Sequence, residues 1–178
     1  MTKDQLAKIA LNAPSGSVDE LWPFIENTLT KYELDTSLRQ SHFVAQILHE
    51  SGEFRYREEI ASGRAYEGRE DLGNTKKGDG RRFKGRGLIQ LTGRTNYMLY
   101  GRAIGRETEV LGNPEIIASD NNLCVDTAGY YWDNAGLSLW ADKDDLLTIT
   151  RRINGGLTGL SMRRKLLNLA KKVLGETT

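Results

Sequence analysis

Two acidic positions in the first half of the sequence could act together as a general acid and a general base. Glu50 lies at the predicted end of an amphipathic helix, where the helix dipole and an apolar face would both disfavour its charged form. Glu58 and Glu59 follow in an arginine-rich segment, whose positive charge would keep a carboxylate ionised. Glycoside hydrolysis requires two carboxyl groups with such opposite tendencies, although glutamates at these spacings also occur on ordinary solvated surfaces.

A second stretch, residues 83–97, combines glycines with uncharged hydrogen-bonding side chains. Gln90, Thr92 and Asn96 lie among apolar residues, and the glycines allow the backbone to approach a ligand closely. Side-chain amides suit the hydroxyl and N-acetyl groups of a sugar. The same residues could instead satisfy buried backbone groups around a turn, so the stretch by itself leaves both interpretations open.

Helical periodicity predicts the elements that must position these side chains. The predicted helices cover residues 2–10, 19–32 (with Pro23 in the first turn), 37–50, 95–104, 121–134, 144–153 and 161–174. Between positions 52 and 87 the sequence is polar and glycine-rich, which is typical of a long functional loop, and any sheet is expected within residues 54–83. The pattern indicates a mainly α domain with a small loop or β-hairpin insertion after the third helix.

The composition is that of an ordinary globular protein and argues against several kinds of site. The chain has 178 residues, of which 38% are hydrophobic and 28% charged, enough for one core without disulfides. A single cysteine permits no intramolecular disulfide, and one cysteine with two histidines is too few for a zinc site of the Cys/His kind. The net charge of +1 argues against nucleic-acid binding through bulk charge. We expect neither a metal nor another cofactor.

Three short motifs, in this order, resemble those of glycoside hydrolase family 19, which comprises chitinases and the phage and bacterial endolysins related to them. The motifs are His49-Glu50-Ser51, the block from Gly85 to Thr92 that continues to Asn96-Tyr97, and the turn Ile153-Asn154-Gly155-Gly156; with Ala128-Gly129-Tyr130-Tyr131-Trp132 and Gly136-Leu137 they span residues 37–164. The resemblance implies a lysozyme-like, two-lobed helical fold, whose cleft cleaves β-1,4 bonds next to N-acetylated sugars with inversion.

The resemblance also implies roles for individual residues. Glu50 would be the general acid, and Thr92 would help to hold the attacking water. The sugar sites would be lined by Gln90, Asn96, Tyr97 and Asn154. Plant chitinases of the family carry the general base in a longer, disulfide-tied segment that this chain lacks, whereas the shorter endolysin branch uses an acidic residue nine positions after the first, which indicates Glu59. Glu58 is the alternative base or a substrate contact, because alternation in a hairpin would place the two on opposite faces.

A run of seven basic residues without an acidic one lies between positions 80 and 106. They are Arg81, Arg82, Lys84, Arg86, Arg94, Arg102 and Arg106. Such a run favours polyanions, and the carboxylates of bacterial peptidoglycan fit it better than neutral chitin does. A nucleic-acid-binding interpretation rests on this run alone, and the interleaved aromatic residues of an RNA-binding sheet are missing. The basic segment 161–174 could also contact an anionic envelope, but we expect its leucine face to pack into the core and its lysines to be solvated.

Together these features predict a single catalytic domain, residues 1–178, that acts as an endolysin. It would be a monomeric muramidase that hydrolyses peptidoglycan without a cofactor or a specific nucleic-acid partner. Because the sequence shows no signal peptide, no separate wall-binding module and no apolar run of about 20 residues, the enzyme would accumulate in the host cytoplasm until its release to the cell wall. A chitinase that uses the same residues and a catalytically inactive glycan-binding protein are the alternatives.

Overall fold

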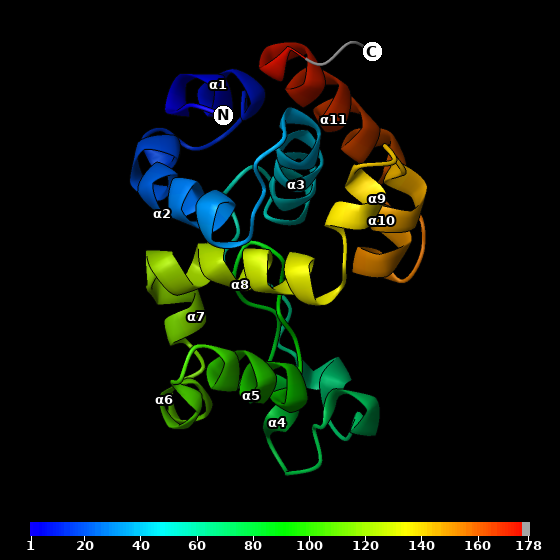
Figure 1. Cartoon of the computed structure of the whole chain (residues 1–178). Helices are drawn as coiled ribbons and strands as arrows, with labels where there is room; N and C mark the ends of the chain where they lie inside the picture. The colour runs from blue at the N-terminus through cyan, green and yellow to red at the C-terminus, as the bar shows by residue number, and fades with distance from the viewer. Residues whose placement is uncertain (176–178) are drawn as a thin grey trace.

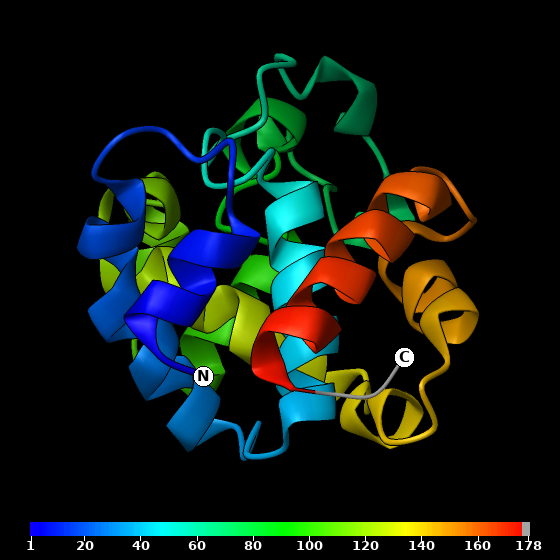
Figure 2. The same ribbon diagram turned by 90° about the horizontal axis from the view of Figure 1, so that it is seen from above.

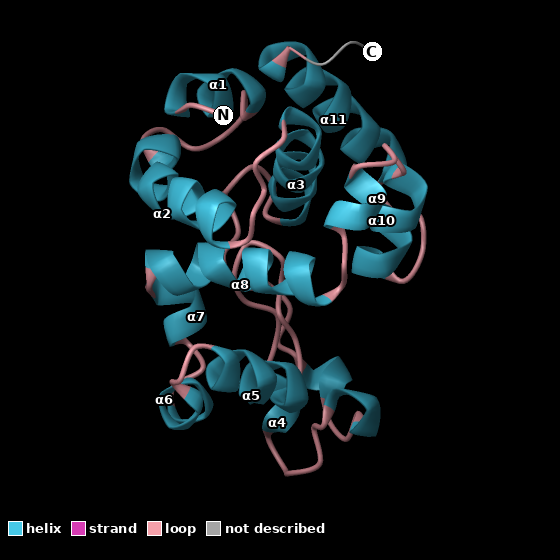
Figure 3. Cartoon of the chain, viewed as in Figure 1, coloured by secondary structure: helices cyan, strands magenta, loops and turns pink. Residues whose placement is uncertain are grey.

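The computed structural model describes residues 1–175, which form eleven α-helices and two 3₁₀ turns (Figure 1 and Figure 3). The helices are α1 (Lys3–Ile9), α2 (Ser17–Lys31), α3 (Ser37–Glu50), α4 (Asp79–Arg82), α5 (Arg94–Ala103), α6 (Glu107–Gly112), α7 (Ile116–Ser119), α8 (Asn121–Asn134), α9 (Ser138–Ala141), α10 (Leu146–Asn154) and α11 (Leu160–Leu174); the 3₁₀ turns are η1 (Arg64–Tyr66) and η2 (Glu70–Leu72). Among these residues, no helix is both long and apolar enough to cross a membrane, and no group of three or more His, Cys, Asp or Glu side chains is placed to hold a metal ion.

The seven predicted helices are all present, with shifts of one or two residues at their ends. The Thr2 hydroxyl caps α1 by accepting from the amide of Gln5, whose side chain accepts in return from the amide of Thr2. Helix α2 begins at Ser17, two residues earlier than predicted, so that Pro23 lies in its second turn. Periodicity does not predict the short helices α4, α6, α7 and α9, because four to six residues are too few to show a helical period.

Two hydrophobic cores lie on either side of α8, which crosses the middle of the molecule in Figure 1. The larger core is built from α1, α2, α3, α9, α10 and α11, and the smaller core from α5, α6, α7 and the loop before α5. Helix α8 serves both, because Val125 and Trp132 lie in the larger core and Leu123 in the smaller. The predicted two-lobed helical architecture is therefore confirmed.

Helix α3, which ends at Glu50, is buried on every side over residues 41–48. Helix α11 packs along it, as Figure 2 shows, and α9 contacts it as well. The ring of Phe43 meets that of Trp132 edge to face, with the ring centroids 5.5 Å apart. Because neighbours hold the helix from several sides, the position of its last residue is well fixed.

The insertion between α3 and α5 is a chain of turns, and the β-hairpin alternative is not formed. No strand occurs in residues 1–175, and only two isolated bridges link Glu58 to Arg86 and Arg86 to Leu91. Gly63, at φ +75°, lets η1 pack directly on α4, since a Cβ atom there would lie 2.4 Å from the carbonyl oxygen of Gly80. Glu58 and Glu59 are therefore positioned by tertiary contacts within this loop, and not by a strand ladder.

Candidate active site

Glu50, the expected general acid, forms an ion pair with a buried arginine from α11. The guanidinium of Arg163 donates to Oε1 of Glu50 and to Oε1 of Gln46, and its Nε donates to the carbonyl of Thr158 at 3.3 Å. The side chain of Arg163 is 1% exposed and that of Glu50 is 18% exposed. Arg163 thus holds one carboxylate oxygen of Glu50, while Oε2 has no hydrogen-bond partner among the described residues.

Arg163 is a residue of the candidate site that the sequence interpretation missed. The expectation of a solvated basic face on the last helix is wrong at two positions, because Arg163 and Lys171 are both buried, and Lys171 pairs with Asp144. Both cations lie four residues from Leu167, the spacing that places side chains on one helix face, so the signal was present in the sequence. Arg163 therefore supplies Glu50 with a buried partner that neither the helix end nor the apolar face of the preceding helix predicts.

Glu59, the expected general base, is held by neutral hydrogen-bond donors. The hydroxyl of Tyr66 donates to Oε1 at 3.0 Å, and the amide of Gly85 donates to Oε2 at 3.2 Å. The ammonium group of Lys84 reaches only the backbone carbonyl of Glu59, at 2.9 Å. Each carboxylate oxygen keeps a further lone pair, so the side chain can still accept a hydrogen from water.

Glu58, the alternative base, is engaged in ion pairs. Nζ of Lys84 lies 2.6 Å from its Oε1, and Nε of Arg86 lies 3.4 Å from its Oε2. Partial burial opposes ionisation, but the hydrogen bond from Lys84 and the charge of Arg86 outweigh it and lower the pKa of Glu58 below its usual value. These cations come from outside the arginine-rich segment around Glu58, whose own Arg57 pairs with Glu20. A carboxylate bound by two cations is a weak base, so the geometry favours Glu59.

A cavity of about 220 Å³ gathers residues of the second motif with two residues of the larger lobe. It is lined by Leu72, Ile89, Gln90, Leu91, Thr92, Asn96, Tyr131 and Ile153. The structure brings Gln90, Thr92 and Asn96 together in this cavity. Its wall includes Tyr131, whose hydroxyl has a pKa raised by burial and, to a smaller extent, by the charge of Glu50.

The three polar side chains of this cavity also donate to nearby backbone carbonyls. Gln90 donates to Gly87 at 3.0 Å, Thr92 to Gln90 at 2.8 Å, and Asn96 to Thr92 at 2.7 Å. Gln90 has φ +58°, an unusual backbone conformation for a residue other than glycine, and it turns the segment sharply. Because the Thr92 hydroxyl has given its only hydrogen to Gln90, it can interact with a water only as an acceptor.

Two of the predicted sugar contacts lie outside this cavity. Tyr97 is placed away from the cavity: its side chain is 0% exposed, its ring packs on Phe83 with centroids 5.3 Å apart, and its hydroxyl donates to the carbonyl of Lys84 at 2.7 Å. Tyr97 is a core residue behind the site. Asn154 is the exposed last residue of α10, and its neighbour Ile153 is the one that lines the cavity.

The basic run between positions 80 and 106 is largely neutralised. Five of its seven cations pair with carboxylates, namely Lys84 and Arg86 with Glu58, Arg94 with Asp79, Arg102 with Glu107, and Arg106 with Glu109. Arg82 donates to two backbone carbonyls, and Arg81 has no ion pair among the described residues. The run is therefore not one free basic surface.

Comparison with known proteins decides the family. Residues 44–138, more than half of the chain, match the model of the glycoside hydrolase family 19 domain, described as class I chitinase. The chain belongs to glycoside hydrolase family 19. A Haemophilus influenzae protein described as containing a glycosyl hydrolase family 19 domain is 33% identical in a match that covers 84% of this chain and 87% of that protein. An Arabidopsis thaliana endochitinase is 33% identical over 131 residues, which cover 74% of this chain but only 42% of that protein.

Solved structures of family 19 chitinases share the fold. Chitinase C from Streptomyces griseus superposes with a TM-score of 0.80 at 19% identity, over 99% of this chain and 93% of that chain. The class IV chitinase of Zea mays gives a TM-score of 0.78 at 22% identity, over 99% of this chain and 94% of that chain. The predicted mainly α, lysozyme-like fold is thus confirmed, and the family identifies the chain as a glycosidase related to chitinases.

Proposed function

We propose that this family 19 glycosidase hydrolyses the β-1,4 bonds of bacterial peptidoglycan, as an endolysin-type muramidase, with inversion of configuration. The observation that carries the catalytic part is the contrast between two carboxyls: Arg163 holds Glu50 at one oxygen, whereas Tyr66 and the Gly85 amide hold Glu59. An inverting hydrolase requires one carboxyl that donates a proton and one that activates water. Oε2 of Glu50 is free for the first role, and Glu59, which is bound by neutral donors and by no cation, is free for the second.

In this mechanism Glu50 donates a proton from Oε2, the oxygen that Arg163 leaves free, to the departing glycosidic oxygen. Arg163 then stabilises the carboxylate that remains. Glu59 takes a proton from a water on the opposite face of the sugar, and Thr92 accepts the other hydrogen of that water. The inverting geometry requires the two carboxyls to lie about 6.5 to 9.5 Å apart, so that the water fits between them.

Support for a bacterial enzyme that differs from the plant endochitinases comes from the extent of the matches. The chain aligns with 87% of the Haemophilus influenzae protein, but with 42% of the Arabidopsis thaliana endochitinase. It also has a single cysteine, Cys124, and so cannot form the disulfide-tied segment that carries the base in plant chitinases of the family. The proposed lytic enzyme is a monomer that needs no cofactor, accumulates in the host cytoplasm and acts after release to the wall.

A chitinase is the second candidate, because the matched plant relatives and the similar solved structures are chitinases. The amides of Gln90 and Asn96 suit the N-acetyl groups of either polymer, so the cavity at these residues serves both. The two candidates share their catalytic residues and differ only in the substituents that the cleft must accept.

The experiment that separates the candidates compares products from both polymers. Purified peptidoglycan and chitin oligomers are digested with the chain and with its Glu50→Gln variant, reduced with borohydride and analysed by mass spectrometry. Reduced muramic acid ends that are absent from the variant digest support the muramidase, whereas products from chitin alone would establish a chitinase. No product from either polymer would leave a glycan-binding protein. Proton NMR of fresh products should show the α anomer, since the cleaved bond is β and the reaction inverts.

A further inference from the structure

A second cavity, between η1 and α4, is lined by more positive than negative side chains. Its volume is about 470 Å³, and it is lined by Arg64, Glu67, Lys77, Gly78 and Arg81. The three cations are exposed, and none of them forms an ion pair with another residue in the range 1–175. Three positive charges therefore face one carboxylate.

The carboxylate of Glu67 is bound by backbone amides. Glu67 accepts from the amide of Gly78 at 2.6 Å and from the amide of Gly80 at 2.9 Å, and these hydrogen bonds hold the pKa of Glu67 below its usual value. Glu67 thus links the end of η1 to the start of α4, and the close contact of Gly63 with Gly80 holds the same two elements together. The η1–α4 pocket is therefore a braced structure whose cations are free to bind an anion.

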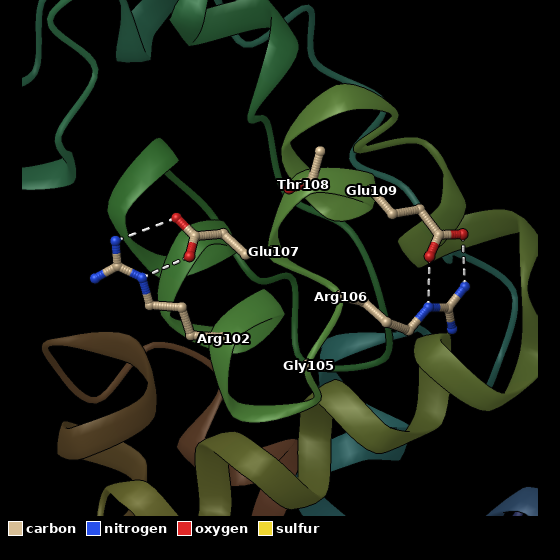
Figure 4. Close-up of a pocket in the computed structure, with 6 residues that line it drawn as sticks. All are labelled: Arg102, Gly105, Arg106, Glu107, Thr108 and Glu109. Atoms are coloured by element: carbon tan, nitrogen blue, oxygen red, sulfur yellow. Dashed lines mark hydrogen bonds and ion pairs between the residues drawn. The ribbon is translucent and has the colours of Figure 1, made fainter.

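A cavity of similar size between α5 and α6 shows the opposite arrangement. Its volume is about 480 Å³, and Figure 4 shows that each of its two arginines faces its own glutamate. Arg102 donates to Glu107 at 2.7 and 3.2 Å, and Arg106 donates to Glu109 at 2.6 and 2.7 Å. The unpaired charge, and not the size of the cavity, therefore distinguishes the η1–α4 pocket.

The η1–α4 pocket is mechanically linked to the candidate active site. Arg64 begins η1 and Tyr66 ends it, and the hydroxyl of Tyr66 donates to Glu59. One short turn thus presents a cation to the pocket and a hydroxyl to the expected general base. A glycan strand that passes Glu59 would carry its substituents within reach of this turn.

We propose that the η1–α4 pocket binds the carboxylates that peptidoglycan carries on its lactyl groups and peptides, and so selects the wall polymer over neutral chitin. This inference rests on the proposed function. Arg64 and Arg81 supply planar guanidinium groups that match a carboxylate with paired hydrogen bonds, and Lys77 adds a point charge. Chitin has no group that these cations would recognise.

The test measures binding with the full-length Glu50→Gln chain, which lacks the proposed acid, on sacculi stripped of teichoic acids, on the same sacculi with amidated carboxyls, and on chitin. In that background Arg64→Gln/Arg81→Gln is compared with Arg102→Gln/Arg106→Gln, which alters the same residue types and the same charge in the other cavity. We expect the first pair to weaken Kd for sacculi about tenfold and the second less than about twofold. Amidation should weaken binding of the Glu50→Gln chain by a similar factor and abolish the difference between the pairs.

Each other outcome overturns a defined part of the argument. Equal losses from the two pairs would show a bulk charge effect and would contradict carboxylate binding at the η1–α4 pocket without contradicting the proposed function. A loss that persists on amidated sacculi would do the same. Binding of the Glu50→Gln chain to chitin but not to sacculi would overturn the proposed function and the pocket with it. Circular dichroism of both double variants confirms that they remain folded.

Discussion

The two carboxyls of the site are positioned by contrasting means. Glu50 ends a helix that is buried in the larger core, and its partner Arg163 lies 113 residues later in the chain. Glu59 lies in a loop without strands, and its partners Tyr66 and Gly85 belong to the same insertion. The position of Glu50 therefore depends on core packing, and that of Glu59 depends on hydrogen bonds within a chain of turns.

This difference predicts which substitutions affect the stability of the fold and which affect mainly the reaction. A change at Arg163 removes a buried charge and should affect both the fold and the reaction, because that ion pair bridges α3 and α11. A change at Tyr66 removes one hydrogen bond near a half-exposed loop and should mainly affect the reaction. The following variants test this contrast.

The largest effect is expected at Glu50 itself. Glu50→Gln keeps an oxygen that can accept from Arg163 but has no acidic proton, so kcat should fall by about 10⁴-fold, the upper end for a positioned proton donor. The chain should stay folded, which circular dichroism checks. Activity close to that of the unsubstituted chain would remove Glu50 from the mechanism.

The next effect concerns the choice of base. Glu59→Gln should lower kcat by about 10³-fold, whereas Glu58→Gln should lower it by less than about tenfold, since Glu58 is already bound by Lys84 and Arg86. Steady-state assays of the two variants under identical conditions provide the comparison. The opposite ranking would transfer the role of base to Glu58.

A third variant probes the buried ion pair. Arg163→Met leaves Glu50 without its cation and should reduce the free energy of unfolding by about 3 kcal/mol, because one partner of a buried pair remains uncompensated. Arg164→Met is the matched control on the exposed side of α11, with an expected change below about 0.5 kcal/mol. Urea unfolding measures both, and equal effects would mean that the buried pair does not stabilise the larger lobe.

A smaller effect is expected at Tyr66. Tyr66→Phe removes the hydroxyl that donates to Glu59 and should lower kcat about three- to tenfold, the equivalent of one hydrogen bond. Tyr56→Phe is the control, because that tyrosine is 42% exposed and its hydroxyl has no partner among the described residues. If Tyr66→Phe reduced the free energy of unfolding as much as Arg163→Met does, the contrast between the positioning of Glu50 and that of Glu59 would be contradicted.

The smallest effect is a pH dependence in the larger lobe, where both histidines of the chain lie on α3. Burial lowers the pKa of His42, and burial together with the charge of Arg163 lowers that of His49, from an ordinary value of 6.5. The unfolded chain therefore takes up protons that the folded chain resists, so the free energy of unfolding should fall as the pH drops below about 6.5. Urea unfolding at about pH 7.5 and 5.5 tests this sign, and His49→Gln should flatten the dependence. A rise in stability on acidification would contradict it.

Much of the architecture follows from the sequence because helical periodicity is a local signal. The apolar spacing on α3 and α8 predicts both helices to within a residue, and the cap at Thr2 sets the start of α1. The motifs around Glu50 and Thr92 also identify the family before any contact is known. The conformation of the insertion between α3 and α5 is harder to predict, because turns such as η1 and η2 show no sequence periodicity and take their shape from the residues that they pack against.

The long helices and the family follow from the sequence, which also predicts Glu50 as the first carboxyl. The tertiary structure was needed to show that Arg163 reaches Glu50, that Glu58 is bound by cations while Glu59 is not, and that Tyr97 is a core residue. The physical reason is that a periodic pattern shows which residues share a face of one helix, but not which residue of a distant element meets that face. Charge pairing is decided by such meetings, and in this protein it is charge pairing that separates the two carboxyls.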